Sequence, residues 1–120
     1  MEITAAVGAL AALAQDSRLK VFRLLVRSGP TGMAAGDIAR TLAVPSNTMS
    51  SHLAILSRAG LVTSRKESRS VIYAVDLEGT RALLSFLLED CCRGKPDLCT
   101  PLIEATLASC CPEPAACCQS

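Results

Sequence analysis

The stretch DIARTLAVPSNTMSSHLAILSRAGLV, residues 37–62, decides the fold of this chain. The sequence predicts a short helix over 34–45 that closes in a tight turn at Pro45. A second helix follows over 46–60, where Gly60 provides a stop. Its apolar residues recur at helical spacing: Met49, Leu53 and Leu56. Two helices joined by so short a turn predict a helix-turn-helix.

The residues after this stretch change from a helical to an alternating period. Residues 61–76 predict a β-hairpin with a charged turn at 66–70. The apolar residues of its second arm alternate and face Val62 and Ser64 of the first: Val71, Tyr73 and Val75. The order of helix, turn, helix and hairpin is typical of a winged helix-turn-helix, mainly α with a small β-hairpin.

Small polar residues crowd the N-terminal half of the 46–60 helix, where a recognition helix meets base edges in the major groove. The predicted DNA-binding residues of this helix are Ser46, Asn47, Thr48, Ser50, Ser51 and His52. A lone histidine beside core leucines is more often a packing or hydrogen-bonding residue than a metal ligand, so His52 is not assigned to a metal. Three cations of the hairpin are expected on the DNA backbone: Arg65, Lys66 and Arg69.

Two further segments predict helices that pack on a partner chain. Residues 3–14 are rich in Ala and Leu and apolar nearly all round, which favours burial in a core or against a second subunit. Residues 78–92 present a broad apolar face of the same kind. Between the first segment and the helix-turn-helix, Asp16 is the expected N-cap of another helix. Its predicted inward stripe consists of Leu19, Phe22, Leu25 and Val26.

Residues 10–76 resemble the ArsR/SmtB family of bacterial winged-helix repressors. The resemblance is carried by LAQDSRLKVFRLL (13–25), by residues 37–62 and by VIYAV (71–75), with Ser50-Ser51-His52-Leu53 its most specific part. One departure is the hairpin turn, where the family commonly has a glycine. The resemblance implies a homodimer joined through the first and last helices. It also implies a double-stranded operator with two-fold symmetry, and release when an ion binds.

The length of the chain predicts a single domain, and the distribution of its charges indicates that only the N-terminal part binds nucleic acid. The chain has 120 residues and a net charge of +1. Residues 1–76 hold nine Lys/Arg against five Asp/Glu, whereas residues 77–120 hold three against six. Glu2 stands where a secretory signal would carry a basic residue, and the apolar run is too short to span a bilayer. A cytoplasmic protein without membrane association is expected.

All seven cysteines lie in the last thirty residues. Reduced cytosolic thiols that cluster in this way suggest metal or redox chemistry. We therefore expect a DNA-binding and dimerisation domain over 1–92 and a metalloid-binding tail over 93–120. The predicted ligands are Cys91, Cys92 and Cys99, since Gly94 and Pro96 favour a reversal between them. A weaker set could add a ligand or a second site: Cys110, Cys111, Cys117 and Cys118.

Three thiolates without an assigned His, Asp or Glu suit three-coordinate As(III) or Sb(III) as the inducer, whereas zinc would want a fourth ligand. Alternative inducers are methylated trivalent arsenicals, which need only two thiols, soft metals such as cadmium, and thiol oxidation. No organic cofactor is expected. The Cys-x5-Arg loop of a thiol arsenate reductase is missing and no nucleophile–base pair stands out, so the chain is not expected to be an enzyme.

Overall fold

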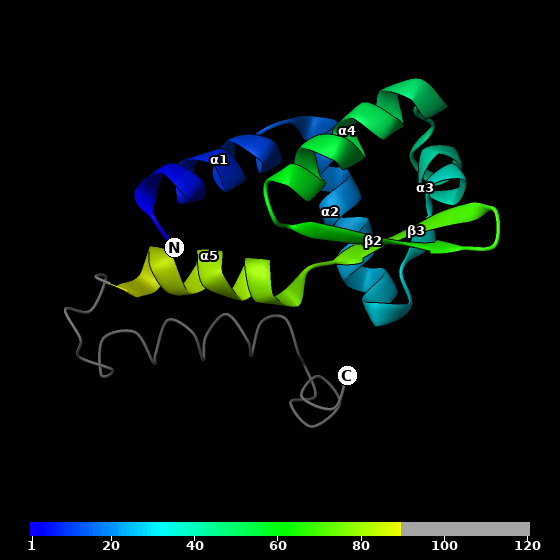
Figure 1. Ribbon diagram of the computed structural model, residues 1–120. Helices are drawn as coiled ribbons and strands as arrows, with labels where there is room; N and C mark the ends of the chain where they lie inside the picture. Colours follow the sequence, from blue (N-terminus) through cyan, green and yellow to red (C-terminus); the bar gives the residue numbers. More distant parts are fainter. Residues whose placement is uncertain (90–120) are drawn as a thin grey trace, which may run out of the picture. The chain divides into compact units, whose positions relative to one another are not determined.

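The computed structural model describes residues 1–89, which form five α-helices, one 3₁₀ turn and three strands (Figure 1). In chain order these are α1 (Ile3–Leu13), α2 (Asp16–Ser28), η1 (Gly29–Thr31), β1 (Met33–Ala34), α3 (Ala35–Leu42), α4 (Ser46–Arg58), β2 (Val62–Glu67), β3 (Ser70–Val75) and α5 (Leu77–Glu89). The predicted winged helix-turn-helix order is confirmed. The end of the predicted 78–92 helix lies outside the described residues, and the domain division at residue 92 stays a prediction.

The core lies among α2, α3 and α4, and aliphatic side chains build it. The largest side chains with almost no exposed surface come from all three helices and from the residue that precedes β2: Val21, Leu25, Ile38, Met49, Leu53, Leu56 and Leu61. The three apolar residues that recur at helical spacing in the 46–60 helix are all buried. An aliphatic core at close-packed density holds the two helices of the helix-turn-helix at one angle.

The prediction for α2 is wrong in two respects. Its N-cap is Gln15, whose side-chain oxygen accepts a hydrogen bond from the Arg18 amide at 2.8 Å, so Asp16 is already helical. The inward stripe is also shifted, because Val21 and Leu25 are buried whereas Leu19 and Val26 are about half exposed. A helix packed on several neighbours buries the positions that those neighbours reach, and spacing alone does not reveal them.

The hairpin forms with the predicted register and gains a third strand. Val62 pairs with Val75 and Ser64 with Tyr73, in a sheet of order β1-β3-β2. The two-residue strand β1 pairs with β3 and was not predicted, because two residues carry no periodic signal. The hairpin turn places Ser68 at φ 54°, a left-handed conformation that glycine adopts more easily.

The first turn of α5 is fastened to the end of α4. The Asp76 amide donates to the Leu61 carbonyl oxygen at 2.9 Å, and the Asp76 carboxylate accepts from the Gly79 amide at 3.0 Å. Gly79 approaches Gly60 so closely that a Cβ on Gly79 would overlap the Gly60 carbonyl oxygen. The start of the helix that precedes the thiols is therefore in direct backbone contact with the end of the recognition helix.

The two outer helices leave large apolar side chains in solvent. On α1 the buried residues are alanines, whereas Ile3 is 70% exposed and Val7 is 60% exposed. On α5, Leu84 and Leu87 are about half exposed. These faces are where the sequence predicts a second subunit. Among residues 1–89, no helix has the length and apolar character needed to cross a membrane.

Candidate nucleic-acid interface

The recognition helix α4 presents two chemically distinct faces. Its buried face carries the three apolar core residues, while five small polar side chains at its N-terminal end are exposed: Ser46, Asn47, Thr48, Ser50 and Ser51. Asn47 accepts a hydrogen bond from the Thr48 amide at 3.0 Å, and the Ser51 hydroxyl donates to the Asn47 carbonyl at 3.4 Å. Short side chains with free donors and acceptors can approach base edges and phosphates closely.

The turn before α4 sets its direction. Ala43 ends α3 in the left-handed conformation at φ 55°, and its amide bonds back to the carbonyls of Ala39 and Arg40. Val44 donates to the Ala39 carbonyl at 3.0 Å, and Pro45 then begins α4 from an extended conformation. This pair of hydrogen bonds, closed by the left-handed Ala43, is a Schellman motif. It confirms the tight turn predicted at Pro45.

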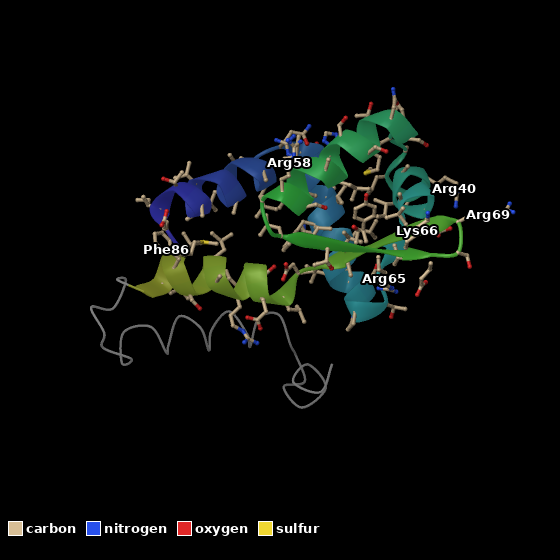
Figure 2. All side chains as sticks on the ribbon, viewed as in Figure 1. Arg40, Arg58, Arg65, Lys66, Arg69 and Phe86 are labelled. Carbon is tan, nitrogen blue, oxygen red and sulfur yellow. The ribbon has the colours of Figure 1, made fainter. Side chains whose placement is uncertain are left out.

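The wing carries two cations with no acidic partner within the described residues. Lys66 and Arg69 stand at the hairpin end, and in Figure 2 the Arg69 side chain extends beyond the tip. Lys66 pairs with Val71 across the strands, so the two side chains share one face of the hairpin. Exposed, unneutralised cations at a loop tip can bind phosphate without reading sequence.

Arg65, the third predicted wing cation, is placed differently. Its guanidinium donates to the Thr31 carbonyl at 2.7 Å and lies 3.5 Å from the Pro30 carbonyl. Its Nε also donates to Glu67 at 3.2 Å. Arg65 thus lies on the opposite face of β2 from Lys66, as strand alternation requires.

His52 is half-buried on α4, which fits the predicted packing role. Its Nδ1 atom is buried and has no hydrogen-bond partner in residues 1–89. Over the same residues, no three His, Cys, Asp or Glu side chains come close enough to hold a metal ion. All the predicted thiol ligands lie outside the described residues, so their placement stays a prediction: Cys91, Cys92, Cys99, Cys110, Cys111, Cys117 and Cys118.

Two exposed cations of α3 and α4 were not among the predicted DNA-binding residues. Arg40 on α3 pairs with Asp37, and Arg58 lies at the C-terminal end of α4 (Figure 2). Neither belongs to the polar run of the recognition helix or to the charged hairpin. Both positions fall within the predicted helices over 34–45 and 46–60, so the sequence held the signal that could have marked them.

Comparisons with known proteins agree with this geometry. A helix-turn-helix domain family matches residues 13–65. The chain is 32% identical over 82 residues to the transcriptional activator HlyU of Vibrio cholerae, an alignment that covers 68% of this chain and 73% of HlyU. The structure of reduced HlyU superposes with a TM-score of 0.58 at 30% identity, covering 72% of this chain and 87% of that one.

Two further relatives extend the comparison. The homodimeric winged helix-turn-helix DNA-binding domain of a possible ArsR-family regulator from Mycobacterium bovis superposes with a TM-score of 0.60 at 26% identity, covering 73% of this chain and 81% of that one. The putative arsenical resistance operon repressor ArsR of Halobacterium salinarum is 32% identical over 83 residues, which are 69% of this chain and 64% of that protein.

The fold and the polar face of α4 define a winged helix-turn-helix transcriptional regulator. Within that class, the chain belongs to the ArsR family. The prediction that it is a regulator and not an enzyme is confirmed, since these relatives are transcriptional regulators with a DNA-binding domain.

Proposed function

We propose that the chain is a homodimeric repressor that leaves a two-fold symmetric operator when As(III) or Sb(III) binds Cys91, Cys92 and Cys99. One observation carries the proposal. The DNA-reading residues lie between 46 and 69, whereas every cysteine of the chain lies beyond residue 90. A sensor made of thiols is thereby kept apart in sequence from the surface that reads DNA.

The ligand chemistry favours a trivalent metalloid. Arsenite is a neutral As(OH)₃ molecule, and three thiols replace its hydroxyls to form three As–S bonds with release of three waters. A site made only of thiolates selects soft acceptors of this kind. Cys91 and Cys92 follow the last described residue of α5 closely, and the Gly94–Pro96 segment can return Cys99 to them.

The junction between α5 and α4 supports a route from the thiols to the DNA. Strain at the cysteine end of α5 would reach its first turn, where Asp76 bonds to Leu61 and Gly79 touches Gly60. A shift there changes the angle of the recognition helix within the dimer. If the ion weakens DNA binding, DNA weakens ion binding by the same factor.

The dimer and the direction of control also belong to the proposal. The exposed apolar residues of α1 and α5 support a self-complementary interface. Among the relatives, HlyU is an activator, and the Halobacterium protein is a putative arsenical resistance repressor. Release from DNA by a thiol-bound metalloid fits a repressor of arsenical resistance, as the Halobacterium protein is described.

Fluorescence anisotropy of a labelled duplex tests the proposal. The duplex is selected from a random-sequence library by the full-length wild-type chain, then titrated with arsenite, antimonite, methylarsenite, cadmium and zinc. We expect arsenite or antimonite to release the wild type. We expect Cys91→Ser, Cys92→Ser and Cys99→Ser to bind DNA normally and to stay bound.

The remaining thiols provide matched controls. Cys110→Ser/Cys111→Ser and Cys117→Ser/Cys118→Ser remove thiols of the same kind, and we expect both double variants to respond as the wild type does. Arsenite release that survives each single substitution at Cys91, Cys92 and Cys99 would place the sensor elsewhere. Release of the Cys99→Ser variant by methylarsenite would indicate a two-thiol site for methylated arsenicals, and release by cadmium alone would indicate a soft-metal sensor.

Thiol oxidation is the second candidate. One observation favours it: the HlyU structure with which this chain superposes is that of the reduced protein. Adjacent thiols and a third nearby could form a disulfide under peroxide. Release by peroxide that a thiol reductant reverses, with no response to arsenite, would favour oxidation over metalloid binding.

A further inference from the structure

We propose that Arg65 is a positioning residue that clamps the wing to the turn after α2, and that the phosphate-binding charge of the wing comes from Lys66 and Arg69. The inference rests on the proposed DNA binding. It changes the role that the sequence assigned to Arg65 and divides the wing cations by function.

The hydrogen bonds of Arg65 carry the inference. Its Nη2 donates to the Thr31 carbonyl at 2.7 Å, and its Nη1 lies 3.5 Å from the Pro30 carbonyl. Both oxygens belong to η1, which continues directly from α2. Carbonyl groups at the end of a helix lack intrahelical partners and carry partial negative charge. A planar guanidinium satisfies two such oxygens at once.

A third hydrogen bond directs the guanidinium. Nε donates to Glu67 at 3.2 Å, two residues along the same strand. Glu67 and Arg65 share one face of β2 because side chains alternate along a strand. All three nitrogens of the guanidinium therefore face protein oxygens. These bonds use three of the five N–H donors of the guanidinium and fix its plane.

The turn that Arg65 holds is itself tightly placed. Gly29 and Gly32 have φ of 70° and 73°, and a Cβ on Gly32 would overlap the Tyr73 carbonyl oxygen of β3. The turn thus presses on the central strand, while Arg65 reaches it from the edge strand β2. Two strands of the wing are tied to the end of α2 in this way.

Lys66 and Arg69 make none of the side-chain hydrogen bonds that hold Arg65, within residues 1–89. Neither has a salt-bridge partner within residues 1–89, and Arg69 extends beyond the hairpin tip in Figure 2. The slope of log K against log salt is negative, and removing a phosphate-binding cation makes it less negative by about 0.9 for each phosphate that is no longer neutralised. A residue that only positions the wing lowers affinity at every salt concentration and leaves the slope unchanged.

The first test measures operator affinity against salt for the full-length chain and the library-selected duplex. Because a dimer carries two wings, we expect Arg69→Gln and Lys66→Gln each to make the slope less negative by about 1.8, which is about 0.9 for each subunit. We expect Arg65→Gln and Arg65→Lys to weaken binding about tenfold with an unchanged slope, because neither side chain has the rigid planar fork that holds both carbonyls and Glu67 at once. If Arg65→Gln makes the salt slope less negative by as much as Arg69→Gln does, the proposal is overturned.

The second test uses the free protein and is independent of DNA binding. In the ¹⁵N-labelled chain, we expect a resolved Arg65 Nε–H signal, identified by its loss in Arg65→Lys. We also expect the Gly32 amide, which bonds to Gly29 at 3.1 Å, to exchange faster in Arg65→Lys. Unchanged Gly32 exchange contradicts the clamp.

The two tests separate the two proposals. Addition of the duplex should move the Arg69 Nε–H signal and leave that of Arg65 in place, and a shifted Arg65 signal would show binding to phosphate. If the library yields no bound duplex, DNA binding fails, while the clamp is still judged by the free-protein signals.

Discussion

At the scale of single residues, Gly60 and Gly79 allow the end of α4 and the first turn of α5 to touch. The Gly79 position has no room for a Cβ, because the Gly60 carbonyl oxygen occupies that space. The neighbour is backbone and cannot rotate away as a side chain could. A glycine inside a helix is usually a weak point, but here close approach requires it.

Gly79→Ala should therefore destabilise the protein despite the better helix propensity of alanine. We expect the free energy of unfolding to fall by about 1–3 kcal/mol, the range found for overpacked sites. Urea denaturation followed by circular dichroism measures this change.

Gly36→Ala is the matched control, since Gly36 is also helical but a Cβ there meets only the Arg40 side chain, at 3.5 Å. Its free energy of unfolding should be unchanged or raised by up to about 1 kcal/mol. Equal losses in the two variants would contradict the close-approach argument.

At the scale of elements, the two faces of the recognition helix have different roles: the buried face stabilises the fold and the polar face is the one expected to contact DNA. Leu53 lies on its buried face with no exposed surface, whereas Thr48 is exposed on its polar face. A core that consists of aliphatic side chains from three helices has little room to rearrange around a cavity.

Leu53→Ala should lower the free energy of unfolding by about 2–5 kcal/mol, because it removes a buried side chain and leaves a cavity. Thr48→Ala should change it by less than about 0.5 kcal/mol, as surface substitutions usually do. Thermal and urea unfolding of both variants measure the difference. A large loss for Thr48→Ala would mean that the polar face is part of the core.

At the scale of the whole molecule, the outer helix α1 leaves apolar surface without a partner in the described part of the chain. Ile3, Val7 and Leu10 form an exposed apolar stripe on α1, and their spacing places them on one side of the helix. Such a stripe on an outer helix marks a protein interaction site.

Val7→Asp should convert the proposed dimer into monomers, because it puts a charge in the middle of this stripe. Sedimentation velocity should show the lower mass, and operator affinity should fall at least about a hundredfold, since each monomer alone contacts only one half-site. Lys20→Glu introduces an acid on an exposed part of α2 and should leave the assembly state unchanged. A Val7→Asp chain that remains dimeric would exclude α1 from the interface.

The fold was largely predictable from the sequence, and particular residues show why. Met49, Leu53 and Leu56 recur at helical spacing and are buried, while Val71, Tyr73 and Val75 alternate and pair as expected. These are local periodicities, which the sequence displays directly. The expected burial of Leu19 and Val26 was wrong, because their surroundings depend on which elements pack against α2.

Three features follow from the amino-acid sequence alone: the winged helix-turn-helix order, the polar end of the recognition helix and the gathering of every thiol beyond residue 90. The role of Arg65 depends instead on how the chain packs. By composition Arg65, Lys66 and Arg69 are equivalent cations on one hairpin. The carbonyls of Pro30 and Thr31, more than thirty residues away in the chain, come within reach of Arg65 alone. Proximity between residues so far apart arises from packing, which local sequence patterns do not encode.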